Sequence, residues 1–115
     1  MAMVMILNDA PYGIERTYNG LRLAGSLARK GVPVRLFLMG DAAIAAKAGQ
    51  KVPQGYYNAQ TMVAAVLRHG GEVAVCGTCL DARGVGEGEL LEGAHRSTLE
   101  ELTTWVAEAE KVLTF

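Results

Sequence analysis

Short apolar runs that alternate with segments of helical periodicity constrain the fold of this chain more than any other feature. Residues 4–7, 34–39 and 73–75 are apolar at nearly every position. Such short continuous runs are typical of strands that are buried on both faces of a parallel sheet. Between them, apolar residues recur every three or four positions and predict helices over 14–30 and 58–70. This order predicts an α/β fold, a mostly parallel sheet with helices on both faces.

The rest of the chain extends the same pattern to a sheet of about five strands. At 115 residues, half of them apolar, the chain has enough apolar material for one core, so we expect a single domain over 1–115. The further elements that we expect are short helices near 42–48 and around Leu90 and Leu91, and strands near 94–95 and at 111–115.

The last helix is predicted from a capping signal. Ser97 and Glu100 have the spacing of a capping box, in which a hydroxyl and a carboxylate satisfy the first free amides of a helix. In the helix that follows, Leu99, Leu102 and Val106 are expected to pack inward.

Charge and the N-terminus restrict the classes of partner. Lys and Arg (11) nearly balance Asp and Glu (12), so the net charge of −1 gives no support to nucleic-acid binding. The apolar stretch 1–7 is too short for a signal peptide or a membrane span. We therefore expect a cytoplasmic protein without membrane association, whose cysteines meet a reducing environment.

Three loops are expected to gather at the carboxyl edge of the sheet, where α/β proteins bind ligands. One loop is 8–13, the second is Gly40-Asp41, and the third contains Cys76. Asn8, Asp9, Tyr12 and Arg16 are candidates to line the same crevice as Cys76. Asn8 and Asp9 have an alternative role as turn caps, and Tyr12 has an alternative role in packing.

The segment Cys76-Gly77-Thr78-Cys79 carries the strongest chemical signal. Two intervening residues let both sulfurs approach each other, and a loop amide or helix N-terminus stabilises the reactive thiolate. Gly77 leaves room for a partner's sulfur, and Thr78 has a hydroxyl that can donate to a thiolate. The alternative is that Cys76 is simply buried at the end of a strand.

Three chemistries suit this pair of cysteines. The first is dithiol–disulfide exchange. The second is a metal site, but structural zinc needs four ligands and only His69 and His95 remain as nitrogen donors, so we expect none within one chain. The third is sulfur carriage by one cysteine of low pKa, with Arg83 lowering that pKa or receiving an anionic donor.

The segment from Cys76 to Val85 resembles the active-cysteine region of the DsrE/DsrF/TusD-like sulfur-relay family. In that family a strand-end cysteine is followed by small residues and then by Arg-Gly and an aliphatic residue, which Cys76, Arg83, Gly84 and Val85 match. The resemblance covers nearly the whole chain and points to the YchN-like single-gene branch. Further matching segments are 8–13, 15–20, 37–41, 55–58 and the ending from Trp105 to Phe115.

The resemblance implies a flavodoxin-like domain, a cytoplasmic homo-oligomer (trimer or hexamer) and a persulfide-accepting cysteine at Cys76. It implies sulfur donor and acceptor proteins as partners, and the chemistry needs no cofactor. The family's sulfur carriers use a lone cysteine in this loop, whereas this chain adds Cys79. Cys79 has the chemistry to resolve a Cys76 persulfide into a disulfide and release sulfide.

Sulfur transfer at Cys76, with contributions from Cys79 and Arg83, is therefore the leading functional hypothesis. A dithiol redox protein or sensor is the second. The third is a non-catalytic oligomeric protein that binds a small ligand or a partner chain in the crevice.

Overall fold

The computed structural model describes residues 2–115, which form one five-stranded sheet with every strand parallel to its neighbours. The strand order is β4-β3-β2-β1-β5, so the direction of strand addition reverses between β1 and β5. The strands are β1 (Met3–Leu7), β2 (Val34–Leu38), β3 (Glu72–Cys76), β4 (Ala94–Ser97) and β5 (Lys111–Thr114).

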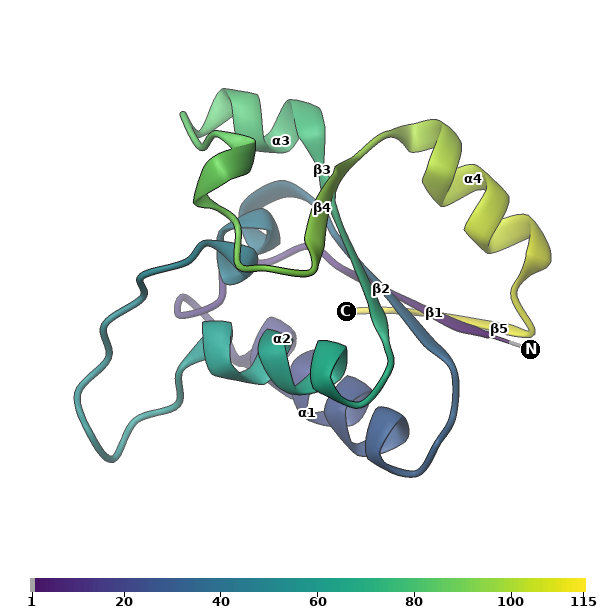
Figure 1. The fold of residues 1–115 in the computed structure, drawn as a ribbon, viewed down its shortest axis with the longest axis horizontal. Coiled ribbons are helices and arrows are strands. Elements are labelled where there is room, and N and C mark those ends of the chain that lie inside the picture. Colours follow the sequence, from purple (N-terminus) through teal and green to yellow (C-terminus); the bar gives the residue numbers. More distant parts are fainter. Residues whose placement is uncertain (1) are drawn as a thin grey trace.

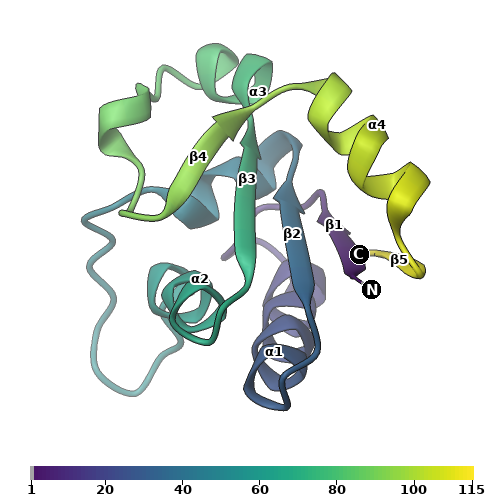
Figure 2. The same ribbon diagram turned by 45° about the vertical axis from the view of Figure 1, so that its right-hand side comes forward.

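Helices cover both faces of this sheet (Figures 1 and 2). The helices α1 and α2 pack side by side on one face, and α4 crosses the other face. The short helix α3 follows β3 directly at the carboxyl edge of the sheet. The helices are α1 (Glu15–Arg29), η1 (Gly40–Ala46), α2 (Ala59–Arg68), α3 (Gly77–Ala82), η2 (Glu87–Glu89) and α4 (Leu99–Glu108), where η denotes a 3₁₀ helix. The α/β fold predicted from the sequence is confirmed.

Local signals set the ends of the main helices. Gly31 follows α1 with φ at 82°, a left-handed conformation that glycine adopts without a steric penalty. The Asn58 side chain accepts a hydrogen bond from the Thr61 amide and caps α2. No helix within residues 2–115 is long and apolar enough to cross a membrane.

Two apolar clusters of unequal size lie on the two faces of the sheet. The larger one, beneath α1 and α2, includes Leu7, Leu36 and Val75, all fully buried. The smaller one lies beneath α4, where Phe37 packs edge-on against Trp105 with ring centroids 6.1 Å apart. The α4 face is therefore the thinly covered face of the sheet.

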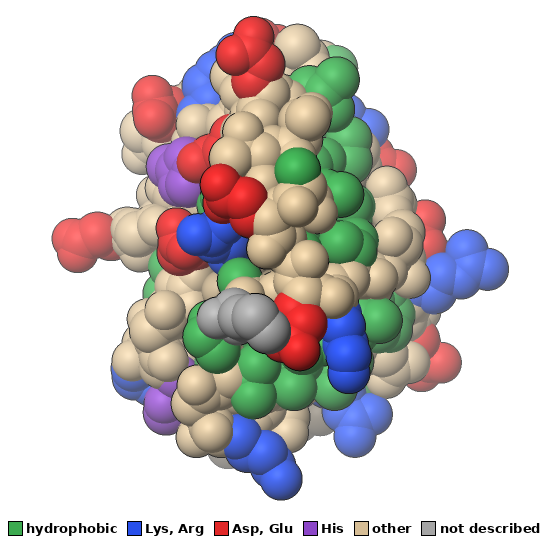
Figure 3. All heavy atoms as spheres, turned by 90° about the vertical axis from the view of Figure 1, so that its right-hand side faces the viewer, with side chains coloured by type: hydrophobic (Ala, Val, Ile, Leu, Met, Phe, Trp, Pro, Cys, Tyr) green, Lys and Arg blue, Asp and Glu red, His purple; other side chains and the backbone are tan. Residues whose placement is uncertain are grey.

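The expected start and packing of the last helix were wrong by one position. The N-terminal cap of α4 is Thr98, whose hydroxyl accepts from the Glu101 amide at 3.2 Å, instead of Ser97. Leu102 and Trp105 are buried, but Leu99 and Val106 are 71% and 40% exposed. Figure 3 shows apolar side chains gathered on this side of the molecule.

The expected helix around Leu90 and Leu91 was also misplaced. The structure has the short helix η2 just before these residues, and both leucines pack into the larger cluster. The Leu91 amide donates to the Ala46 carbonyl at 2.9 Å and the Leu90 amide to the Glu87 carbonyl at 3.2 Å. Burial and not helical periodicity therefore explains why both residues are apolar.

Candidate functional site

Cys76 is the last residue of β3 and also the cap of α3. Helix α3 follows without a loop because Gly77 lets the chain pass beneath Arg96. A Cβ at Gly77 would lie 2.9 Å from the Arg96 guanidinium carbon, closer than side chains tolerate. The chain therefore changes from strand to helix at Cys76, and the small residues Gly77 and Thr78 follow it directly.

Cys76 Sγ accepts hydrogen bonds from the first turn of α3. The Cys79 amide donates to it at 3.4 Å, and the Thr78 hydroxyl lies at 3.4 Å. Burial raises the pKa of this thiol, but the hydrogen bonds from Cys79 and Thr78 outweigh burial and lower the pKa below its ordinary value. Cys76 is thus the residue of the pair that favours the thiolate.

Cys79 has the opposite character. Burial and the hydrogen bond that its thiol donates to Cys76 raise its pKa, although the Gly40 amide, which donates to Cys79 Sγ at 3.1 Å, and the charge of Arg83 act against this. The two cysteines also pack against different apolar clusters, Cys79 against the α1–α2 cluster and Cys76 against the α4 cluster. The two cysteines of the CxxC segment therefore differ, with the thiolate favoured more at Cys76 than at Cys79.

Arg83 lies with Cys79 and η1. Its guanidinium contacts Asp41 Oδ1 at 2.7 Å and 2.9 Å and donates to the Cys79 carbonyl at 3.0 Å. Gly40 and Asp41, which the sequence placed at this edge, are thus joined to α3 through Cys79 and Arg83. The charge of Arg83 acts to lower the pKa of Cys79.

Arg96 is the guanidinium beside Cys76, and sequence reasoning missed it. Both of its terminal nitrogens bond the Asp81 carboxylate at 2.8 Å, and this pair holds the guanidinium over Gly77. The bond to Asp81 raises the pKa of Arg96, and a smaller part of the rise comes from the nearby Cys76 sulfur. The only sequence signal was an arginine in the short strand next to the one that ends at Cys76.

Cys76 opens into a cavity of about 360 Å³ on the α4 side of the sheet. The exposed Leu99 forms one of its walls, together with residues of β2 and of the β4–α4 junction. The cavity is lined by Phe37, Met39, Cys76, Gly77, Thr78, Arg96, Ser97, Thr98 and Leu99. A ligand sulfur that reaches Cys76 therefore meets mostly apolar walls, with the hydroxyls and Arg96 to one side.

The loop after β1 was expected to line the same crevice, and its side chains have other partners. Asn8 Nδ2 donates to the Phe115 carbonyl at 3.0 Å, and Asp9 pairs with Arg16 at 3.4 Å. The Tyr12 hydroxyl bonds the Gln50 side chain and accepts from the Ala59 amide at 2.9 Å. These four contacts tie the loop to Phe115 after β5, to α1, to Gln50 and to α2, and none of Asn8, Asp9 and Tyr12 lines the cavity at Cys76.

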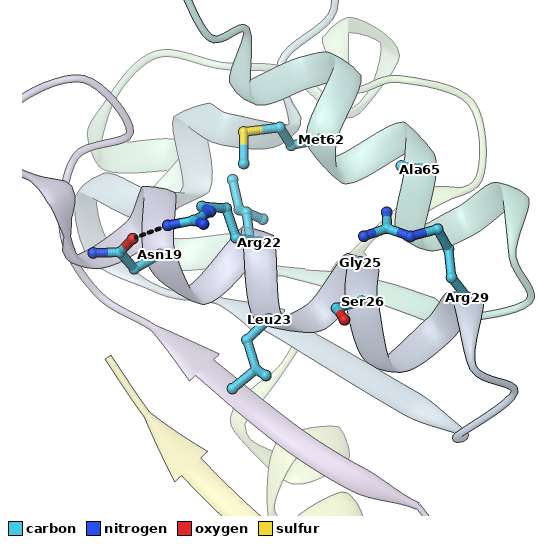
Figure 4. Close-up of a pocket in the computed structure, with 9 residues that line it drawn as sticks. Asn19, Arg22, Leu23, Gly25, Ser26, Arg29, Met62 and Ala65 are labelled. Carbon is cyan, nitrogen blue, oxygen red and sulfur yellow. Dashed lines mark hydrogen bonds between the residues drawn. The ribbon is translucent and has the colours of Figure 1, made fainter.

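A larger hollow of about 560 Å³ lies away from the cysteines, between α1 and α2 (Figure 4). Arg22 and Arg29 stand at its two ends, with Gly25 and Ser26 between them. Arg22 points toward Asn19 and donates to its side chain at 3.2 Å. This hollow has no cysteine in its lining, so the chemistry of the CxxC segment lies at the smaller cavity.

The two histidines do not converge on the cysteines. His69 is the C-terminal cap of α2, and His95 Nε2 lies 2.7 Å from the Glu101 carboxylate. Within residues 2–115 no group of three or more histidine, cysteine or acidic side chains is arranged to hold a metal ion.

Fold and site together define a class: a small α/β protein with a cysteine of lowered pKa at a strand end and a second cysteine of raised pKa three residues later. The model of the DsrE/DsrF-like family matches residues 1–115, and the chain belongs to that family. Protein YchN of Escherichia coli K12 is 43% identical over 115 residues, which cover 98% of this chain and 97% of YchN. An uncharacterized protein of Methanocaldococcus jannaschii, MJ0989, is 36% identical over the full length of both chains.

Solved structures agree with this assignment. The crystal structure of the E. coli ychN protein superposes with a TM-score of 0.94 at 42% identity, covering 100% of this chain and 99% of the other. A protein of unknown function from Methanobacterium thermoautotrophicum, MTH1491, has a TM-score of 0.76 at 14% identity, covering 99% and 97% of the two chains. The second likeness concerns the fold alone.

Proposed function

We propose that the protein is a sulfur carrier that accepts a persulfide sulfur on Cys76 and passes it to an acceptor thiol. The observation that carries this proposal is the opposite shift of the two thiols, with the pKa of Cys76 lowered and that of Cys79 raised. Membership of the DsrE/DsrF-like family, whose name is associated with sulfur relay, supports the same chemistry.

The loading step needs only a thiolate and a donor persulfide. The Cys76 thiolate attacks the outer sulfur of R–S–SH, a bond forms between Sγ and that sulfur, and the donor's S–S bond breaks to release R–S⁻. The outer sulfur keeps its proton, so no oxidant or reductant is consumed. The cavity gives the incoming group space, and the Thr78 hydroxyl and the Cys79 amide and thiol stabilise negative charge at Sγ.

Cys79 controls the lifetime of the persulfide on Cys76. As a thiolate it would attack Cys76 Sγ, form the Cys76–Cys79 disulfide and release HS⁻. The raised pKa of Cys79 lowers the fraction of its thiolate and so slows this reaction, because the thiolate is the attacking form. The pair is therefore suited to holding a persulfide rather than to discharging it.

The test is to incubate the reduced protein with a persulfide donor and to measure its intact mass. We expect wild type and Cys79→Ser to gain one sulfur atom and Cys76→Ser to gain none. A wild-type protein that gains no sulfur, or a Cys76→Ser variant that gains as much, would overturn the proposal.

Dithiol redox exchange is the second candidate, because the Cys79 thiol is hydrogen-bonded to Cys76. It predicts a Cys76–Cys79 disulfide in equilibrium with the cellular glutathione pool. A reduction potential far below that of glutathione, without turnover of disulfide substrates, would exclude this role.

We also propose that the protein works as a cytoplasmic homo-oligomer that meets separate sulfur donor and acceptor proteins. The exposed apolar side chains Leu99, Val106 and Val112 support self-association, because they lie on the thinly covered side of the sheet. Sedimentation of a monomer at micromolar concentration would contradict this.

A further inference from the structure

Three polar side chains of β4 and α4 form a line of hydrogen bonds that begins in the cavity at Cys76. Ser97 lines the cavity and is 6% exposed. Its hydroxyl donates to Oε1 of Glu101, and the same oxygen lies 2.7 Å from Nε2 of His95. The loading step does not use these groups.

Ser97 is the neighbour of Cys76 across the sheet. The two residues are paired in register on the parallel strands β3 and β4, so their side chains emerge on the same face, from strands that lie about 4.8 Å apart. Both line the same cavity. A sulfur that reacts at Cys76 is therefore close to the Ser97 oxygen.

The Glu101 carboxylate accepts the hydrogen bond of the Ser97 hydroxyl, and its surroundings favour the ionised form. Burial raises the pKa of its carboxyl group, but the hydrogen bonds from Ser97 and His95 and the charges of His95 and Arg35 outweigh burial and lower the pKa. His95 rests edge-on against Trp105, with 44% of its side chain exposed to solvent. The hydrogen-bonded chain Ser97–Glu101–His95 thus runs from the cavity to solvent.

The other charged groups near this line are paired elsewhere. Arg35 of β2 lies over the Trp105 ring and bonds Glu72 and Glu108. Arg96 of β4 is committed to Asp81. Among these groups, only Glu101 and His95 are joined by hydrogen bonds to the hydroxyl in the cavity.

We propose that Ser97, Glu101 and His95 take the proton from the thiol that receives sulfur from Cys76. This inference rests on the proposed function and concerns its second step. The acceptor R′–SH donates its proton to Ser97 Oγ while Ser97 passes its own proton to the Glu101–His95 pair. The resulting R′–S⁻ attacks the outer sulfur of the Cys76 persulfide, the R′–S bond forms, and the bond from Sγ to the outer sulfur breaks.

The products are R′–S–SH, the Cys76 thiolate and one proton on the Glu101–His95 pair, so atoms and electrons balance. The step needs a base because an ordinary thiol, with a pKa near 8.5, is mostly protonated at neutral pH and only its thiolate attacks. The lowered pKa of Cys76 makes its thiolate a good leaving group but does not help to ionise the acceptor thiol. The apolar walls of the cavity are formed by Phe37, Met39 and the exposed Leu99.

The experiment preloads the protein with sulfur and measures the rate of transfer to glutathione from about pH 6 to about pH 9. The variants are Ser97→Ala, Glu101→Gln and His95→Gln, and each rate is divided by the sulfur that the variant holds. We expect each variant to be slowed roughly 10- to 100-fold at the acid end and less than about twofold at the alkaline end, where glutathione is already ionised. An aromatic thiol, which ionises at lower pH, should restore the variants near neutrality.

Matched controls are Ser26→Ala on α1 and Glu100→Gln beside Glu101, which should transfer as wild type does. If the three variants transfer at wild-type rates near pH 6, or are slowed equally at every pH and with both acceptors, the proton path is wrong. If wild type takes up no sulfur, the sulfur-carrier function itself fails. If wild type loads and transfers while the variants match it, only this inference fails.

Discussion

The guanidinium of Arg96 lies against Gly77, so that a Cβ at residue 77 would come within 2.9 Å of both its Nε and its central carbon. Two bonds of 2.8 Å hold the same guanidinium to Asp81, so a displacement of Arg96 would also disturb this ion pair. Gly77 therefore sets the position of the positive charge next to Cys76.

Gly77→Ala should displace Arg96 and raise the pKa of Cys76, because a thiolate loses stabilisation when a neighbouring cation moves away. The measurement is the rate of Cys76 alkylation as a function of pH in a Cys79→Ser background. Gly88→Ala is the matched control, since a Cβ at residue 88 would meet nothing within 4 Å. An unchanged pH profile for Gly77→Ala would show that Arg96 does not act on the sulfur.

The Cys79 thiol supports the Cys76 thiolate, so removing it should also raise the pKa of Cys76. Cys79→Ala removes the donor, whereas Cys79→Ser keeps a hydroxyl at nearly the same place, and the backbone amide at 79 remains in both variants. We expect Cys76 to be alkylated more slowly at neutral pH in Cys79→Ala than in Cys79→Ser. Equal rates would mean that the amide alone stabilises the thiolate.

The exposed Leu99 and the buried Leu102 should respond oppositely to polar or truncating changes. Leu99→Asp should change the free energy of unfolding of the isolated chain by less than about 0.5 kcal/mol, as surface substitutions do. Leu102→Ala should cost about 2–5 kcal/mol, because it leaves a cavity beneath α4. Denaturant unfolding of the two variants checks this, and a large loss for Leu99→Asp would mean that the residue is covered in solution.

The alternation of strands and helices and the strand-end position of Cys76 could both be predicted from the sequence, because each depends on local patterns. The packing of α4 could not be predicted in the same way. Ser97 and Thr98 are adjacent and both are good caps, and a shift of one residue turns a helix by about 100°. The apolar spacing correctly predicted a buried Leu102, but Leu99 and Val106, which share that spacing, are exposed.

The position of Arg96 next to Cys76 could not be predicted from the sequence for a different reason. It lies 20 residues after Cys76, and its approach to the sulfur depends on the register in which β3 and β4 pair. Arg83 is closer in sequence, but α3 directs it to Asp41 and Cys79. Sequence proximity pointed to Arg83, whereas the register of β3 and β4 places Arg96 over Gly77, next to Cys76.

Acid should destabilise the protein partly through Glu101. Its pKa is lower in the folded chain than in the unfolded chain, whose ordinary value is about 4.3, so below neutrality the unfolded chain binds this proton first. The stabilisation from Glu101 is therefore present above about pH 4.3 and is lost as pH falls through the folded pKa. Glu101→Gln should be less stable than wild type at neutral pH, and the difference should shrink below about pH 4. A difference that is constant from pH 7 to about pH 3 would contradict the ionised state of Glu101.

Arg83→Gln tests whether this guanidinium acts on Cys79 alone. Removing its charge should raise the pKa of Cys79 further and leave the alkylation profile of Cys76 unchanged, because the charge of Arg83 acts on Cys79. A less acidic Cys79 attacks the Cys76 persulfide more slowly. The variant should therefore load sulfur at the wild-type rate and release sulfide more slowly in the absence of an acceptor.

Asp41→Asn is the matched control, since it breaks the same ion pair but keeps the positive charge near Cys79. If Arg83→Gln instead slows loading and raises the pKa of Cys76, then Arg83 serves the nucleophile directly, and the division of roles between the two arginines has to be reversed.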